Sequence, residues 1–163
     1  MLFSSGTEHA MRGLSEMAAR GTQGRVMVEE LAARVDVPRD FLAKMFQRLA
    51  RAGILASTKG RGGGFALARP AHAISLMDIV AALEGPGSMD RCVVGIAACD
   101  ERTACPLHDL FRPIRQRLKD YLATTTLADM GASLRSNPIW QQQQQQQQST
   151  AAAATADVKG RQS

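Results

Sequence analysis

The chain lacks a long apolar run, which argues against a membrane location. Its longest apolar stretch, residues 93–99, is far shorter than the roughly 18 residues of a membrane-spanning helix. The first ten residues, MLFSSGTEHA, have neither the basic nor the apolar segment of a secretory signal peptide. Three cysteines are too few, and odd in number, for the disulfide framework of a secreted domain. We therefore expect a soluble, cytoplasmic protein with no membrane partner.

Common catalytic signatures are also missing. The sequence has no H-x-E…C-x-x-C pattern of a zinc deaminase and no G-x-S-x-G nucleophile motif. It offers no pair of carboxylates on one face suited to acid–base catalysis. We therefore expect neither an enzyme nor a small-molecule substrate.

Basic charge is concentrated in one segment of the chain. Residues 1–72 hold 11 Lys/Arg against 6 Asp/Glu, whereas residues 73–163 hold 9 of each. Within residues 39–69 the count is 7 to 1, and Asp40 is the single acid. A localised basic excess suits a surface that binds phosphates, because each neutralised phosphate releases counterions. A solvated cationic face is the alternative.

The same segment has the pattern of a winged helix-turn-helix. Apolar spacing predicts helices over residues 7–20, within residues 26–37 and from Pro38 to Gly53. Two short strands, 54–57 and 65–68, then flank the glycine-rich stretch 58–64, which suits a hairpin tip. The second helix of such a motif enters the major groove of DNA. The exposed basic positions are Arg39, Lys44, Arg48 and Arg51 on this helix and Lys59 and Arg61 in the hairpin.

The C-terminal half is predicted to add helices outside this motif. Ser75 and Asp78 form a capping box for a helix ending near Leu83. From Pro106 a long helix carries one apolar stripe, which Pro113 should kink or restart: Leu107, Leu110, Phe111, Ile114, Leu118, Tyr121 and Leu122. The stripe is expected to pack against the same helix of a second subunit, or alternatively against its own domain.

Four regions result from this reading. They are a DNA-binding domain over residues 1–84, a cysteine-containing loop over 85–105, a dimerisation helix over 106–135 and a disordered tail over 136–163. The tail includes eight glutamines at 141–148 and four alanines at 151–154, a composition typical of low complexity. Trp140, at its edge, is either a docking anchor or an exposed side chain.

The three cysteines are spaced for a metal centre. Cys92-x6-Cys99-x5-Cys105 places three thiolates close in sequence, and thiolates favour iron–sulfur clusters or zinc. A fourth ligand could come from His108, three residues after Cys105, or from Glu8 or His9 near the first helix if a dimer brings them over. Three reduced thiols, or a reversible disulfide between two of them, are the alternatives.

Taken together, these motifs resemble the Rrf2 family of bacterial transcriptional regulators. The resemblance covers residues 1–135 and rests on T-E-H-A-M-R-G-L, V-E-E-L-A-A-R, the wing S-T-K-G-R-G-G-G-F-A-L-A-R-P, the three cysteines and T-L-A-D-M. It implies a winged-helix homodimer, crossed through the long helix, on a palindromic site in double-stranded promoter DNA. It also implies an iron–sulfur cluster on Cys92, Cys99 and Cys105, with the cluster type, [2Fe–2S] or [4Fe–4S], left open.

The resemblance assigns roles to further residues. His108 matches the histidine ligand of the family's cluster-assembly regulators, and Glu8 falls where its nitric-oxide sensors use an aspartate of the partner subunit. Against the family pattern, the first cysteine interval is x6 instead of x5, Lys59 replaces a wing arginine and Arg61 replaces a proline. We predict that Arg39 and Lys44 contact the major groove, Lys59 and Arg61 the minor groove, and Arg48 phosphate.

The predicted function is a regulator, in the first instance a repressor, that senses iron–sulfur status, redox state or nitric oxide through the cluster. The alternative is a winged-helix regulator without a cluster that uses thiol–disulfide switching or structural zinc.

Overall fold

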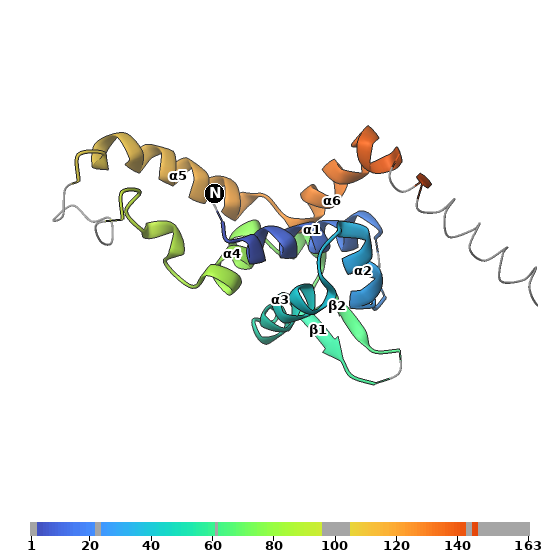
Figure 1. Cartoon of the computed structure of the whole chain (residues 1–163). Helices are drawn as coiled ribbons and strands as arrows, with labels where there is room; N and C mark the ends of the chain where they lie inside the picture. The colour runs from blue at the N-terminus through green and yellow to red at the C-terminus, as the bar shows by residue number, and fades with distance from the viewer. Residues whose placement is uncertain (1–2, 22–23, 61, 96–104, 143–144, 147–163) are drawn as a thin grey trace, which may run out of the picture.

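The fold is mainly helical with one β-hairpin, which confirms the predicted fold class. The computed structural model describes residues 3–21, 24–60, 62–95, 105–142 and 145–146. Its elements are α1 (Ser5–Ala19), α2 (Val28–Val35), α3 (Arg39–Arg51), β1 (Leu55–Thr58), β2 (Gly64–Leu67), the 3-10 turn η1 (Ala71–Ala73), α4 (Leu76–Glu84), the 3-10 turn η2 (Ser88–Asp90), α5 (His108–Thr124) and α6 (Leu127–Arg135) (Figure 1). No helix among the described residues is long and apolar enough to cross a membrane.

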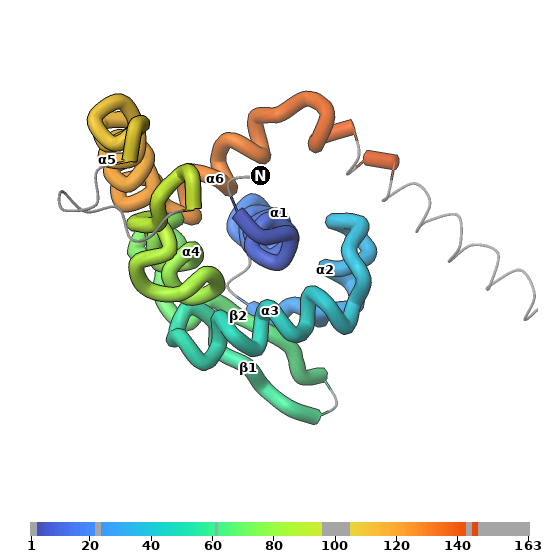
Figure 2. Tube along the Cα trace, turned by 60° about the vertical axis from the view of Figure 1, so that its left-hand side comes forward, coloured from blue at the N-terminus to red at the C-terminus, as the bar shows by residue number. Residues whose placement is uncertain are grey.

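Helix α1 lies at the centre of the core. Figure 2, which views α1 nearly end-on, shows α2, α3, α4 and α6 around it, and all four contact it. Its Ala10 and Leu14 are fully buried against apolar side chains of the other helices. A Cβ added at Gly13 would lie 3.0 Å from the Phe46 ring, so α1 and α3 approach closely at this glycine. Burial of a side chain such as Leu14 contributes about 1.5–3 kcal/mol.

The helix-turn-helix is formed by α2 and α3. Asp36 ends α2 in the left-handed conformation at φ 52°, and Pro38 is the N-cap of α3. The apolar side of α3, Leu42, Met45, Phe46 and Leu49, is buried in the core. Arg39, Lys44 and Arg51 of α3 are exposed, whereas Arg48 is half-buried.

A short bridge anchors the wing to the domain. Strands β1 and β2 pair antiparallel from Leu55 opposite Leu67 to Thr58 opposite Gly64. Phe65 also exchanges two backbone hydrogen bonds with Val26, of 2.8 and 3.0 Å. A Cβ at Gly64 would lie 2.5 Å from the Val26 carbonyl oxygen, so only glycine fits here. The base of the wing is thereby fixed on both sides of β2.

Residues 106–135 do not form the single helix that the sequence predicted. They form α5 and α6, separated at Thr125 and Thr126. Leu76 N donates to the Thr125 carbonyl and Leu127 N to the Ile74 carbonyl, so the chain pairs here with the segment before α4. Thr126 and Asp129 then form a capping box that starts α6. Pro113 lies inside α5 and does not restart it.

The predicted tail is structured at its beginning. The Trp140 indole donates a 2.7 Å hydrogen bond to the carboxylate of Glu16, which is 3% exposed. Trp140 thus docks on α1, which agrees with the interpretation of this residue as a docking anchor. Most of the predicted tail, residues 143–144 and 147–163, lies outside the described residues.

Candidate functional site

Helix α3 and the wing form a basic surface at one end of the molecule. In Figures 1 and 2 both project from the same side, away from α5 and α6. Lys44 and Arg51 on α3 and Lys59 in the wing are exposed. Arg61 lies outside the described residues. The predicted groove-contacting residues that the structure describes, Arg39, Lys44 and Lys59, therefore belong to elements that project from the same side.

Arg39, at the start of α3, is held by surface ion pairs. Its guanidinium donates to Glu29 at 2.7 Å and to Asp40 at 2.6 Å, with 57% of the side chain exposed. These two hydrogen bonds raise the pKa of Arg39 above its ordinary value, and the bond to Glu29 contributes most. The pKa of Glu29 is lowered by its backbone hydrogen bond and by Arg39. Because exposed pairs are screened by solvent, Arg39 can exchange them for a phosphate or a base.

Arg48, predicted to contact phosphate, has a partner inside the protein. Its guanidinium donates to the backbone carbonyl of Leu83 in α4. Its charge also acts on Glu84, whose carboxylate accepts hydrogen bonds from Ser4 N and the Thr7 hydroxyl. Burial alone would raise the pKa of Glu84, but these hydrogen bonds and Arg48 lower it. Arg48 thus links α3 to α4, and its phosphate contact stays a prediction.

The start of α5 brings two of the predicted cluster ligands together. Cys105 and His108 are each 8% exposed, and His108 N donates to the Cys105 carbonyl at 3.0 Å, which closes one turn. Cys105 is a free thiol. A buried thiol and imidazole on one turn are a donor pair suited to zinc or an iron–sulfur cluster.

The other predicted ligands are dispersed or not described. Cys92 is half-buried after η2, and Cys99 lies outside the described residues. Glu8 is half-buried in the first turn of α1. Within the described part of the chain, no three His, Cys, Asp or Glu side chains gather to hold a metal ion. The described residues alone therefore supply the Cys105–His108 pair and not a complete site.

The apolar stripe predicted for α5 divides into two faces. We define the inner face as His108, Phe111, Arg115, Leu118 and Leu122, which are buried or half-buried. We define the outer face as Leu107, Leu110, Ile114 and Tyr121, which are 41%, 71%, 58% and 58% exposed. The inner face follows steps of three and four residues and the outer face steps of three, four and seven, all of which keep side chains on one side of a helix. The inner face packs toward α4, and the outer face is uncovered in this single chain.

Arg115 is a residue of this region that was not among the predicted site residues. It is 8% exposed, and its guanidinium lies over the Phe111 ring with Cζ 5.2 Å from the ring centre. The spacing of 3, 4, 3 and 4 from His108 to Leu122 places it on the buried face, and that spacing is the sequence signal that could have identified it.

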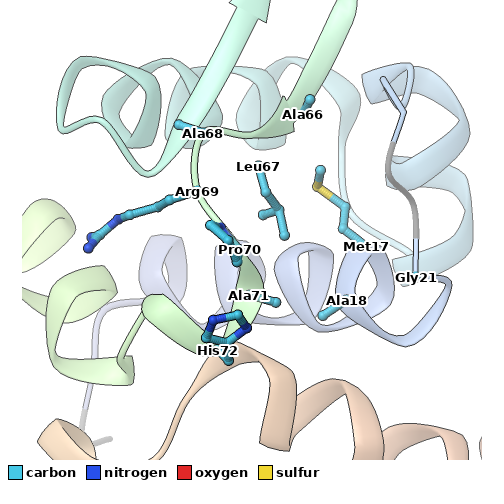
Figure 3. Close-up of a pocket in the computed structure, with 10 residues that line it drawn as sticks. All are labelled: Met17, Ala18, Gly21, Ala66, Leu67, Ala68, Arg69, Pro70, Ala71 and His72. Carbon is cyan, nitrogen blue, oxygen red and sulfur yellow. The ribbon is translucent and has the colours of Figure 1, made fainter.

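A cavity of about 620 Å³ lies between α1, β2 and η1 (Figure 3). Its lining is mostly small and apolar, including Met17, Leu67 and Ala71. In Figure 3 the Arg69 side chain extends away from the cavity, and its guanidinium donates to the Ala73 carbonyl and to Asp78. The cavity therefore lies between the wing strand β2 and α1. The Arg69 guanidinium does not point into it and is not placed to select a ligand.

Comparison with known proteins identifies similar regulators. Residues 3–133 match the Rrf2 family, described as an iron-dependent transcriptional regulator. The chain is 28% identical over 130 residues to the HTH-type transcriptional regulator IscR of Vibrio campbellii, across 80% of this chain and 77% of that protein. It is 31% identical over 118 residues to an HTH-type transcriptional regulator of Neisseria meningitidis serogroup A, across 72% and 79%.

Solved structures of regulators also have a fold similar to that of this chain. The structure of CymR, the global cysteine regulator of B. subtilis, has a TM-score of 0.68 and 25% identity, covering 80% of this chain and 96% of that one. T. potens IscR has a TM-score of 0.62 and 23% identity, covering 78% and 83%, and supports the fold alone. The relatives are transcriptional regulators, which confirms the prediction that the chain is not an enzyme.

Proposed function

The chain belongs to the Rrf2 family of transcriptional regulators, and from this premise we propose that it is a homodimeric repressor controlled by an iron–sulfur cluster. The observation that carries the proposal is the buried Cys105–His108 turn at the start of α5. That turn immediately precedes the exposed apolar outer face. Ligand binding and subunit contact would therefore involve the same helix.

The basic surface is proposed to bind promoter DNA. Lys44 and Arg39 would contact base edges in the major groove, and Lys59 and Arg61 would enter the minor groove. Two such surfaces in a dimer bind half-sites about 34–36 Å apart, which accounts for a palindromic operator. Small changes in subunit orientation would then alter affinity.

The outer face of α5 is proposed as the dimer contact. Leu107, Leu110, Ile114 and Tyr121 form an apolar stripe along four turns, interrupted by the exposed Arg117 between Ile114 and Tyr121. Pairing with the same face of a second copy would remove it from water, at about 25 cal/mol for each Å² of apolar surface buried.

The cluster would be held by Cys92, Cys99 and Cys105, with His108 or Glu8 of the partner subunit as the fourth ligand. Two of these residues support the assignment, because Cys105 offers a soft thiol and His108 an imidazole in one buried turn. When bound, an iron–sulfur cluster supplies a one-electron redox centre whose potential depends on its ligands and their hydrogen bonds.

The protein's own residues provide a route from this site to DNA. Cys92 and Cys99 come between α4 and α5 in the sequence, so fixing their thiolates would restrain the angle between these helices. Helix α4 is in turn tied to α3 by the bond from Arg48 to the Leu83 carbonyl. We propose that ligand loss or oxidation changes the α4–α5 angle and thereby the spacing of the two α3 helices.

The test is anaerobic purification followed by an ultraviolet–visible spectrum and assays for iron, acid-labile sulfide and zinc. We expect brown protein with iron and sulfide, and a Cys99→Ala variant that is colourless but retains its helical circular-dichroism spectrum. Colourless protein that resists reconstitution would overturn the cluster. Zinc without iron, or thiols that form a reversible disulfide, would identify the alternative of a winged-helix regulator with structural zinc or a thiol switch.

A further inference from the structure

The chain segment that follows α6 is fixed to α1 by a bond to a buried carboxylate. Asn137 starts the segment, because its Oδ1 atom accepts from Ile139 N at 2.9 Å and from Trp140 N at 3.3 Å. Trp140 is half-buried, and its indole Nε1 donates to Glu16 Oε2 at 2.7 Å. Glu16 is 3% exposed. A side chain 124 residues further along the chain therefore serves a carboxylate inside the DNA-binding domain.

The same carboxylate orients Arg20, the C-cap residue of α1. Arg20 Nε donates to Glu16 Oε1 at 3.0 Å, and Arg20 Nη1 donates to Glu30 Oε1 in α2, also at 3.0 Å. An exposed ion pair contributes little when a long side chain must be ordered to form it. Because the buried carboxylate already orders the Arg20 side chain, the pair with the exposed Glu30 is formed at a smaller loss of entropy.

The first turn of α2 is held from two sides. Glu30 pairs with Arg20 of α1, and Glu29 pairs with Arg39 of α3 at 2.7 Å. Met27, the N-cap of α2, makes no side-chain cap hydrogen bond, so these two arginines supply side-chain contacts that the cap does not. Arg39 is the first residue of α3 and a predicted groove contact. Its orientation before it meets DNA therefore depends on the position of this turn.

We propose that Trp140 is a positioning residue for DNA binding. Its bond to Glu16 fixes Arg20 on the first turn of α2, and that turn in turn orients Arg39. This role rests on the proposed function, in which Arg39 contacts the major groove. Helix α6 lies across α1 from the wing (Figures 1 and 2), so Trp140, which follows α6, acts on the DNA-binding surface through these contacts and not by touching DNA.

The first test compares DNA affinities of the full-length wild type and Trp140→Phe by fluorescence anisotropy. The probe is a labelled duplex that the wild type has selected from a random pool. Trp140→Phe keeps an aromatic ring, removes the N–H donor and changes no charge. We expect it to bind about 2–30-fold more weakly. The slope of log affinity against log salt should not change, because no phosphate contact is lost. Ile139→Ala, at a neighbouring position that is 65% exposed, is the control and should match the wild type.

A double-mutant cycle tests whether Trp140 acts through Arg20. Arg20→Met should weaken DNA binding because it breaks the same chain of bonds. Adding Trp140→Phe to Arg20→Met should then cause no further loss, whereas adding it to Lys59→Ala should cause its full loss, because residues without shared partners act additively. Arg12→Met removes the same charge from an exposed position of α1 and should bind like the wild type.

Urea denaturation of each variant separates this role from a general loss of structure, because all affinities are measured where the variant is fully folded. A wild type that selects no duplex overturns the proposed function. A wild type that binds its duplex no better than Trp140→Phe overturns the role of Trp140 alone. Additive losses from Trp140→Phe and Arg20→Met also overturn it, because Trp140 would then act independently of the bond chain.

Discussion

At the scale of single residues, Arg48 and Lys59 carry the same charge but have different surroundings. Arg48 is half-buried and donates to the Leu83 carbonyl, whereas Lys59 is exposed at the wing tip. Truncating Arg48 leaves a carbonyl without its charged donor, and truncating Lys59 removes only surface charge. The two substitutions should therefore affect different measurements.

We predict that Arg48→Ala lowers the free energy of unfolding by about 1–3 kcal/mol. Lys59→Ala should leave stability within about 0.5 kcal/mol. Lys59→Ala should also weaken DNA binding and reduce the slope of log affinity against log salt by about one. Urea unfolding and fluorescence anisotropy at several salt concentrations measure both effects. A reduced salt slope with unchanged stability in Arg48→Ala would instead support its predicted phosphate contact.

These residues also show what the sequence could not provide. Helical spacing identified the polar side of α3, but it did not reveal that α4 returns beside Arg48. The same limit applies to Arg115, because its burial depends on the packing of α5 toward α4. Residue type and local spacing predict a surface, whereas the partner of a side chain depends on contacts that are distant in sequence.

At the scale of elements, the packing of α6 on α1 depends on Gly131. A Cβ at this position would lie 2.8 Å from two atoms of Ala18. Arg135 strengthens the same contact by donating to the Ala18 and Ala19 carbonyls at the end of α1. The close approach of the two helices therefore requires glycine.

We predict that Gly131→Ala destabilises the protein by about 1–3 kcal/mol, because the added methyl forces the helices apart. In an exposed helix the same change would stabilise by up to about 1 kcal/mol. Ser133→Ala, at an exposed position of α6, is the matched control and should be neutral or slightly stabilising. Urea denaturation measures both variants, and a stabilised Gly131→Ala would contradict the observed packing.

Helix boundaries were predictable where caps are local. The predicted Ser75–Asp78 capping box is present. The equivalent Thr126–Asp129 box starts α6 inside the segment 106–135 that was predicted as one helix. The sequence predicts the apolar stripe of α5. Its division into a buried inner face and an exposed outer face depends on the packing of α4 beside α5, which the sequence does not reveal. The cysteine spacing predicted three ligands, of which the structure describes Cys92 and Cys105.

At the scale of the whole molecule, α5 reaches out from the domain as an arm (Figure 1), and its outer face has no cover among the described residues. Ile114 lies in the middle of that face and is 58% exposed. A charge there costs little in a single chain, since the position faces water. In a dimer the same charge would be buried opposite its own copy, where two like charges repel in an apolar contact.

We therefore predict that Ile114→Glu yields a folded monomer of 17.5 kDa instead of a dimer. Its affinity for a palindromic operator should fall by about 10²–10⁴-fold, because the second half-site is no longer bound within the same complex. Affinity for a single half-site should be unchanged. Ala123→Glu is the matched control, since it adds the same charge at an exposed position on the opposite side of α5. Light scattering gives the mass, and anisotropy with full and half operators gives the affinities. A dimer that survives Ile114→Glu would place the subunit contact elsewhere, and the proposed coupling between the cysteine ligands and half-site spacing would then lack its connecting helix.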